Sequence, residues 1–238
     1  CMYVCTYACI CVCIYVCVYV YTHIFAWFSW GPTLNENFIR ANQSSTTSWS
    51  LIWSVPVSIS EYQSRGAMLA VEPWSGHYYV DATIYMHAHW TQMADIGWTI
   101  LGVEGGGSGS LSGGGSYCTL VSPDATEYSV VIERLGSTSA TSLNITFLLT
   151  NLPTSKPLQL WKTNEDSFFH QDTGQHLITT ATSVSFEVQG GAIYSLTTLT
   201  TPTHGEFTEP IPASAVFPLP YADDFNSYAN DTLSKYFE

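Results

Sequence analysis

Helical hydrophobic spacing marks two segments in the first half of the chain. Residues 31–42 place Leu34, Phe38 and Ile39 on one face and predict a short helix after a Gly-Pro turn. Residues 81–95 predict a second helix, with Ile84, His87 and Met93 expected on its covered side. Between the helices, residues 46–57 are aromatic and β-branched and predict a buried strand, and residues 58–77 are expected to form a loop. This helix–strand–helix order is typical of α/β folds.

The second half of the chain has the pattern of a β-sandwich. Short runs of β-branched and aromatic residues alternate with clusters of Gly, Pro, Asn and Asp. The predicted strands are residues 97–104, 116–122, 127–133, 143–150, 158–163, 184–190 and 192–200. Residues 201–220 are rich in Pro and predict an extended linker, after which "YADDFNSY" begins a new segment. The predicted fold is therefore mostly β.

Residues 1–24 follow a different rule. Odd positions hold only Cys, Tyr or His, and even positions hold only Met, Val, Thr, Ala or Ile. The first set has pyrimidine–purine–pyrimidine codons and the second has purine–pyrimidine–purine codons, so an alternating DNA repeat translates into this pattern. We interpret the segment as a translated simple repeat and not as native protein. A membrane anchor is the competing hypothesis, since about 20 apolar residues span a bilayer, but no basic residue flanks the segment. Its six cysteines form no CxxC pair of the kind found in zinc ribbons.

Composition narrows the function classes. The chain of 238 residues has six basic and nineteen acidic side chains and a net charge of −13, which argues against binding to nucleic acid. Outside the repeat only Cys118 remains, so no internal disulfide is expected. Three glycosylation sequons begin at Asn42, Asn144 and Asn230 and favour the secretory pathway.

Three motifs contain residue types that could bind ligands or catalyse a reaction. The Gly-rich stretch 102–117 lacks the GK[ST] ending of a phosphate-binding loop and predicts a hairpin loop. His77, His87 and His89 lie close in sequence but do not form HExxH, so hydrogen-bonding roles are expected and no metal or cofactor. "EPWSGHY" at 72–78 combines a carboxylate, two aromatics and a His, which suits either a sugar-binding surface or a buried structural Trp.

Several long segments, in order, resemble the lysosomal galactosylceramidase family of retaining glycoside hydrolases. They include "WGPTLNENFIRANQSSTTSWSLIWS", "MLAVEPWSGHYYV", "LQLWKT", "YSLTTLTT" and "FPLPYADDFN". After the repeat, placed at 1–26, the resemblance implies the C-terminal part of a TIM (β/α)8 barrel at 27–95 and a β-sandwich at 96–200. A linker at 201–220 and the start of a lectin-like domain at 221–238 complete this division of the chain.

The resemblance also implies a lysosomal glycosidase that cleaves the β-galactosyl bond of galactosylceramide with retention, aided by a saposin-type activator. The family's nucleophile and acid/base are glutamates at the ends of the fourth and seventh barrel strands, which would lie upstream of Trp30. We therefore expect this chain alone to be inactive. Trp49, Tyr62 and Trp74 match aromatic residues of the family's sugar pocket and are predicted to bind substrate.

Two departures from the family pattern concern one loop. The family has a Cys where Ser29 stands, paired with a Cys in a sandwich loop that also supplies a sugar-contacting Arg. Here that loop is shortened to residues 133–143, and Arg134 is expected to be a strand-end residue instead. The alternative hypothesis is a noncatalytic sugar- or protein-binding β-sandwich module.

Overall fold

The computed structural model describes residues 30–47, 51–54, 67–135, 141–153, 156–205 and 208–236. Residues 1–24, with the two competing interpretations of their repeat, lie outside the described residues. The chain divides into two units: residues 1–48 with 82–205, and residues 49–81 with 206–238. The predicted barrel segment 27–95 is thus divided between the two units, and its two helices group with the sandwich.

Two antiparallel sheets form the larger unit. The seven-stranded sheet has the order β10-β9-β13-β7-β6-β4, with β5 also paired to β6, and the three-stranded sheet has the order β11-β12-β8. The strands of the larger sheet are β4 (Thr99–Ile100), β5 (Gly109–Ser110), β6 (Ser116–Val121), β7 (Tyr128–Glu133), β9 (Gln159–Thr163), β10 (His170–Gln171) and β13 (Ile193–Thr197). The smaller sheet contains β8 (Leu143–Leu148), β11 (Ile178–Thr179) and β12 (Ser183–Val188). All seven strands predicted for the sandwich are present, and β5, β10 and β11 were not predicted.

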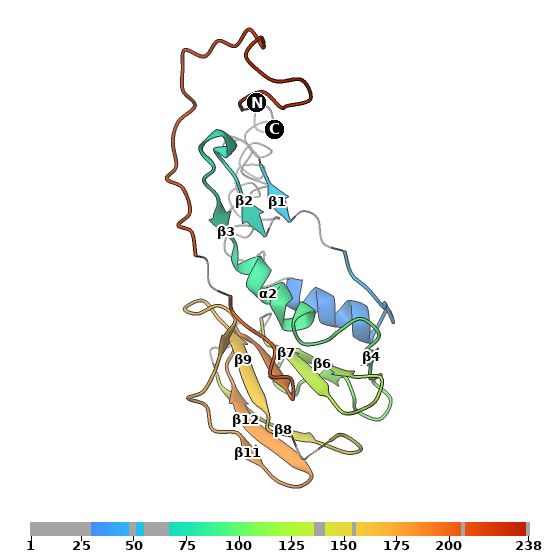
Figure 1. Cartoon of the computed structure of the whole chain (residues 1–238). Helices are drawn as coiled ribbons and strands as arrows, with labels where there is room; N and C mark the ends of the chain where they lie inside the picture. The colour runs from blue at the N-terminus through green and yellow to red at the C-terminus, as the bar shows by residue number, and fades with distance from the viewer. Residues whose placement is uncertain are drawn as a thin grey trace, which may run out of the picture. The chain divides into compact units, whose positions relative to one another are not determined.

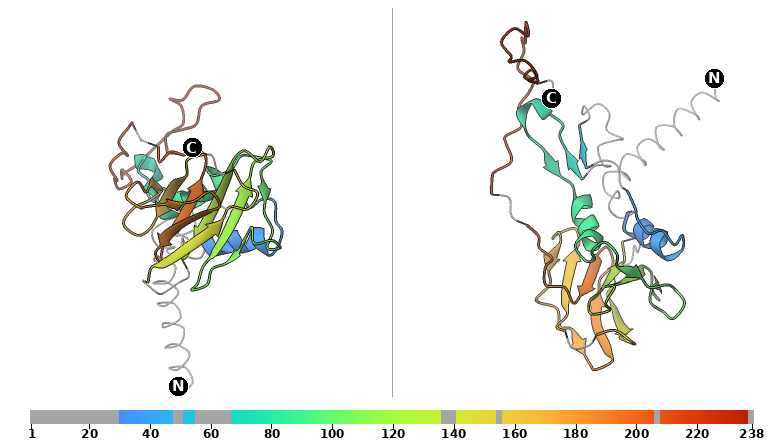
Figure 2. Two further views of the ribbon diagram at one scale, coloured as in Figure 1. Left: turned by 90° about the horizontal axis from the view of Figure 1, so that it is seen from below. Right: turned by 45° about the vertical axis from the view of Figure 1, so that its right-hand side comes forward.

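The central strand β7 is buried along its whole length because both faces of its sheet are covered. Tyr128, Val130 and Ile132 belong to the core between the two sheets. Val131, on the opposite face, packs in a second core with residues of the two helices. Figures 1 and 2 show these helices, residues 30–39 in blue and α2 (Ala82–Thr91) in green, on the same side of the larger sheet. Fully burying each such aliphatic side chain contributes about 1.5–3 kcal/mol.

Of the three residues predicted on the covered side of the second helix, only Met93 is fully buried. Met86, His89, Trp90 and Met93 are buried, whereas Ile84 and His87 are only half-buried. The predicted and the observed buried residues both have helical spacing. Ile84 and His87 lie off the buried face of the helix because the polar residue His89 occupies the centre of the face that packs on the sheet. The His89 ring contacts the Ser195 hydroxyl at 2.8 Å and the Thr163 hydroxyl at 2.9 Å. Because both strand hydroxyls point from the sheet into this core, a histidine that bonds both fits better than an aliphatic residue.

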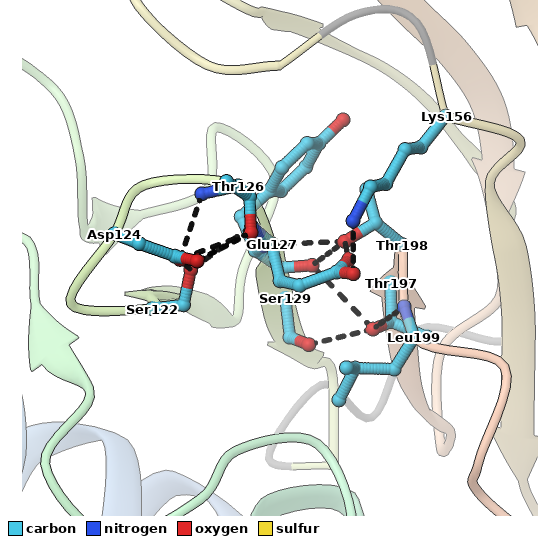
Figure 3. Close-up of polar contacts among 10 residues, drawn as sticks. Ser122, Asp124, Thr126, Glu127, Ser129, Lys156, Thr197, Thr198 and Leu199 are labelled. Atoms are coloured by element: carbon cyan, nitrogen blue, oxygen red, sulfur yellow. Dashed lines mark hydrogen bonds and ion pairs between the residues drawn. The ribbon is translucent and has the colours of Figure 1, made fainter.

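The turn between β6 and β7 is held by side-chain hydrogen bonds (Figure 3). The Asp124 carboxylate accepts hydrogen bonds from the Ser122 hydroxyl at 2.7 Å and from the Thr126 amide at 3.1 Å. These bonds, the Ser122 one first, lower the pKa of Asp124. Glu127, at the end of the turn, pairs with Lys156 and accepts a hydrogen bond from the Thr198 hydroxyl. The network ties the turn to the end of β13.

The smaller unit contains a three-stranded sheet of order β1-β2-β3, formed by β1 (Ile52–Trp53), β2 (Met68–Leu69) and β3 (Tyr79–Val80). β1 pairs with β2 in parallel, and β2 pairs with β3 antiparallel. The strand predicted at 46–57 is present only as β1 in the described residues, and it is not buried there, since Ile52 is 58% exposed. The segment 58–77, predicted to be a loop, contains β2. This strand was not predicted because its two residues, "ML", give no local sign that they pair in parallel with β1.

Stability should depend on pH through His89. Burial is the main cause that lowers the pKa of His89 to about 3 from the ordinary 6.5, so the folded chain keeps this ring neutral while the unfolded chain protonates it below pH 6.5. Stability should therefore fall as pH decreases from about 6.5 towards 3, by about 1.4 kcal/mol for each pH unit. The free energy of unfolding, measured with denaturant over this pH range, should fall with decreasing pH in the wild-type chain. In H89N the part of this fall that is due to His89 should be missing. H176N, at an exposed loop histidine, should keep the wild-type slope, and an H89N slope equal to wild type would contradict this role for His89.

Candidate sugar-binding site

Of the three aromatic residues predicted to bind sugar, the structure places one. Trp49 and Tyr62 lie outside the described residues. Trp74 lies in the smaller unit, in the short 3-10 helix η2 (Pro73–Ser75), and its side chain is half-buried. The structure therefore shows the surroundings of Trp74 alone among the predicted contacts.

The sequence around Trp74 forms a tight, self-bonded turn. Pro73 occupies the first helical position, where its missing N–H removes no hydrogen bond, and Gly76 ends the turn with a left-handed φ of 74°. The Ser75 hydroxyl donates to the Glu72 carbonyl at 2.7 Å and accepts the His77 amide at 3.1 Å. These local bonds fix the direction in which the Trp74 and His77 rings point.

Residues 211–217 of the Pro-rich segment, here called the strap, lie along this turn. The Trp74 indole N–H donates to the Ala215 carbonyl at 2.6 Å, and His77 Nδ1 is 2.7 Å from the Pro212 carbonyl. The Ser214 hydroxyl donates to the Glu72 carboxylate. The carboxylate, the Trp and the His of "EPWSGHY" are therefore all bonded to the strap.

Aromatic contacts extend this interface. The Trp74 and Phe217 rings meet edge to face with centroids 5.4 Å apart, and the His77 and Tyr79 rings do so at 4.6 Å. Phe217 in turn packs against Tyr221, with 5.5 Å between ring centroids. Since the indole N–H and part of the Trp74 ring are engaged by the chain itself, a sugar would have only the remaining ring surface for C–H contacts.

The histidines have the hydrogen-bonding roles that their spacing predicted. His77 bonds the strap, His87 Nδ1 lies 2.8 Å from the Thr83 carbonyl, and His89 bonds two strand hydroxyls. Within the described ranges, no three His, Cys, Asp or Glu side chains come together as a metal site would require. The described residues also contain no helix that is long and apolar enough to cross a membrane.

The comparisons with known proteins agree with the sequence motifs. Residues 22–92 match the model of glycosyl hydrolase family 59. The chain is 33% identical over 215 residues to the galactocerebrosidase of Homo sapiens, and 32% identical over 225 residues to that of Salmo salar. These alignments cover 83% and 87% of the chain but only 30% and 32% of the relatives, so the chain spans about a third of their length. The resemblance to the galactosylceramidase family is confirmed.

The fold is also similar to that of a protein with little sequence identity. The catalytic domain of GH30 xylanase C from Talaromyces cellulolyticus superimposes with a TM-score of 0.53 at 10% identity, covering 71% of this chain and 34% of that one. At this identity the likeness concerns the fold only.

Arg134 lies inside the larger unit and bonds the chain itself. It is 1% exposed and follows β7 directly, as expected for a strand-end residue. Its guanidinium donates to four backbone carbonyls, those of Gly113, Gly114, Thr141 and Val188, at 2.7–3.2 Å. Because these bonds occupy the guanidinium inside the sandwich, Arg134 holds neighbouring loops together.

The sequence pattern did not reveal one buried acidic residue. Glu133, the last residue of β7, is 3% exposed, and burial is the main cause that raises the pKa of its carboxyl group. In sequence it looked like the polar end of a strand. The packing of residues 30–39 against the sheet covers Glu133. Local periodicity does not specify this packing, so the burial of Glu133 could not be predicted.

The three sequon asparagines are all exposed. Asn144 lies on β8, which pairs only with β12 among the described strands, and Asn230 lies in the C-terminal segment. Asn42 follows the helix of residues 30–39 with a left-handed φ of 49°, a conformation that Asn tolerates well. All three positions are accessible to a modifying enzyme.

Removing the indole N–H of Trp74 should loosen the strap. In W74F the Ala215 carbonyl loses its donor, and a hydrogen bond of this kind contributes about 0.5–1.5 kcal/mol. We expect thermolysin to cleave at Ile211, Val216 or Phe217 about two to ten times faster than in the wild-type chain. W98F, a matched change in the other unit, should leave that rate unchanged. Equal cleavage rates in W74F and the wild-type chain would show that the strap does not depend on this bond.

Proposed function

We propose that this chain is the C-terminal barrel part and β-sandwich of a galactosylceramidase-type glycoside hydrolase. The observation that carries the proposal is the 33% identity over 215 residues to the galactocerebrosidase of Homo sapiens. The parallel pair β1–β2 supports the assignment of the smaller unit to a barrel end, since barrel strands of such enzymes run parallel. The substrate class is then a galactosphingolipid such as galactosylceramide, and the compartment is the lysosome.

The reaction of retaining glycosidases requires a specific pair of catalytic groups. Two carboxyl groups about 5–5.5 Å apart are required, one as nucleophile and one as acid/base. We propose that neither is in this chain, in keeping with the expected position of both upstream of Trp30. Glu133, the described carboxyl group whose pKa burial raises, lies in the sandwich, and its bonds to Ser116 and Leu135 give it a structural role in place of a catalytic one.

Within a complete enzyme, the parts described here would support the site in two ways. The sandwich would hold α2 by the His89 bonds and the apolar core around Met86 and Trp90. Trp49 and Tyr62 would supply aromatic surface under the sugar, and Trp74 would fix the strap near the pocket. A saposin-type lipid carrier would present the substrate.

A segment exchange tests the proposed function. A chimera in which residues 30–225 of this chain replace the matching segment of the human relative should hydrolyse galactosylceramide and release β-galactose first. The purified 238-residue chain should show no turnover above buffer. A secreted, folded chimera without β-galactosidase activity would contradict the family function, and turnover by the chain alone would contradict the assignment of both carboxylates. Saturable galactose binding by the chain without turnover would favour the alternative of a noncatalytic module.

Glycosylation tests the proposed compartment. When the chain is directed into the secretory pathway of a eukaryotic cell, peptide N-glycosidase should reduce its apparent mass. N42Q, N144Q and N230Q should each remove one mobility step, because all three side chains are exposed. N37Q, which lies outside any sequon, is the control. A secreted chain with no glycosidase-sensitive mass would rule out all three sites.

A further inference from the structure

A cavity of about 260 Å³ lies between the helix of residues 30–39 and the sandwich, separate from the sugar site. It is formed by the helix on one side and by the ends of three strands on the other. Its lining consists of Pro32, Glu36, Ile39, Arg40, Gly109, Ser110, Gly115, Ser116 and Glu133. Gly115 makes the close approach of β6 possible, because a Cβ there would lie 2.2 Å from the Glu133 carbonyl oxygen.

The buried polar group of the cavity is the Glu133 carboxylate. One oxygen accepts the Ser116 hydroxyl at 2.6 Å, and the other accepts the Leu135 amide at 3.1 Å. Ser116 also receives the Asn35 side-chain amide at 3.0 Å, which links the helix to the cavity wall. These bonds fix the carboxylate in place and leave lone pairs for a further donor, since an ionised carboxylate has about four acceptor positions.

Glu133 forms no ion pair among the residues that the structure describes. Arg40 pairs with Glu36 at 3.6 Å at the exposed surface of the helix, and the neighbouring Arg134 is bonded to backbone carbonyls. Across the described ranges, no basic side chain forms an ion pair with Glu133. A carboxylate withdrawn from water without a cation is unfavourable, so a cationic group that enters the cavity would gain a charge-assisted hydrogen bond.

We propose that this cavity is a binding site for a small organic cation that carries a primary ammonium group. An ammonium donates three hydrogen bonds, which Glu133, the Ser110 hydroxyl and water can accept. The volume is slightly below the range of about 300–1,000 Å³ that is common for drug-sized ligands, which suits a compound of a few heavy atoms. A carboxylate-bound metal ion is less well matched, because the described residues bring no three acidic, His or Cys ligands together.

Ethylammonium titrated into the 238-residue chain, with ethanol as its neutral counterpart, tests the proposal. The amide NMR signals of Gly109, Ser110, Gly115 and Ser116 should shift saturably with ethylammonium and not with ethanol. E133Q should weaken binding at least about ten-fold, as the loss of a hydrogen bond to a charged group predicts. R40Q should tighten binding, since it removes a competing positive charge at the cavity.

E187Q, at an exposed acid on β12, is the matched control and should bind as the wild type does. If E133Q does not fold, S110F on the exposed strand β5 should block the cavity and abolish the ethylammonium shifts. Equal shifts with ethanol and ethylammonium, or wild-type affinity in folded E133Q or S110F, would overturn the proposal. So would the absence of saturable shifts, which would mean that the cavity holds water only.

Discussion

The burial of β7 on both faces is the constraint on which the larger unit depends. A strand that is buried on both sides needs a layer of cover on each side of its sheet. The β8–β12 sheet covers one face, and the helices of residues 30–39 and 82–91 cover the other. The second cover therefore comes from segments that precede the predicted sandwich in the sequence.

This arrangement explains where polar residues occur in the cores. His89 is inside because it bonds Ser195 and Thr163, two strand residues that face the helices. Arg134 is inside because loop carbonyls at the end of β7 need donors. Glu133 differs from both, since its carboxylate accepts two hydrogen bonds but no described basic side chain neutralises its charge. For this reason we propose a cationic ligand for the cavity beside it.

Local pattern predicted the elements well and their partners poorly. Each of the seven predicted sandwich strands was present because β-branched runs bounded by turn residues are a local signal. The covered face of α2 was wrong because Ile84 and His87 look as suitable as Met86 and His89 until the sheet is in place. β2 and β5 were missed because two-residue strands in "ML" and "GS" depend on partners far along the chain.

The candidate site residues were predicted from the family resemblance and not from composition. Motif order led to Trp49, Tyr62 and Trp74, and the structure describes only the last of these. The bonds of Trp74 to the strap could not be predicted, since a Pro-rich segment 135 or more residues away has no local signal for its docking. The long motifs identified the family because they preserve many positions at once, whereas single residues such as Glu133 carry no such signal.

Native-state amide hydrogen exchange tests the shared cover of β7 most directly. The account predicts that buried amides of α2 exchange with the same free energy of opening as those of β7 and β13, because removal of the helices exposes one face of the sheet. Exchange in α2 at a much lower free energy, while β7 stays protected, would contradict it. The sandwich would then be complete without its helical cover.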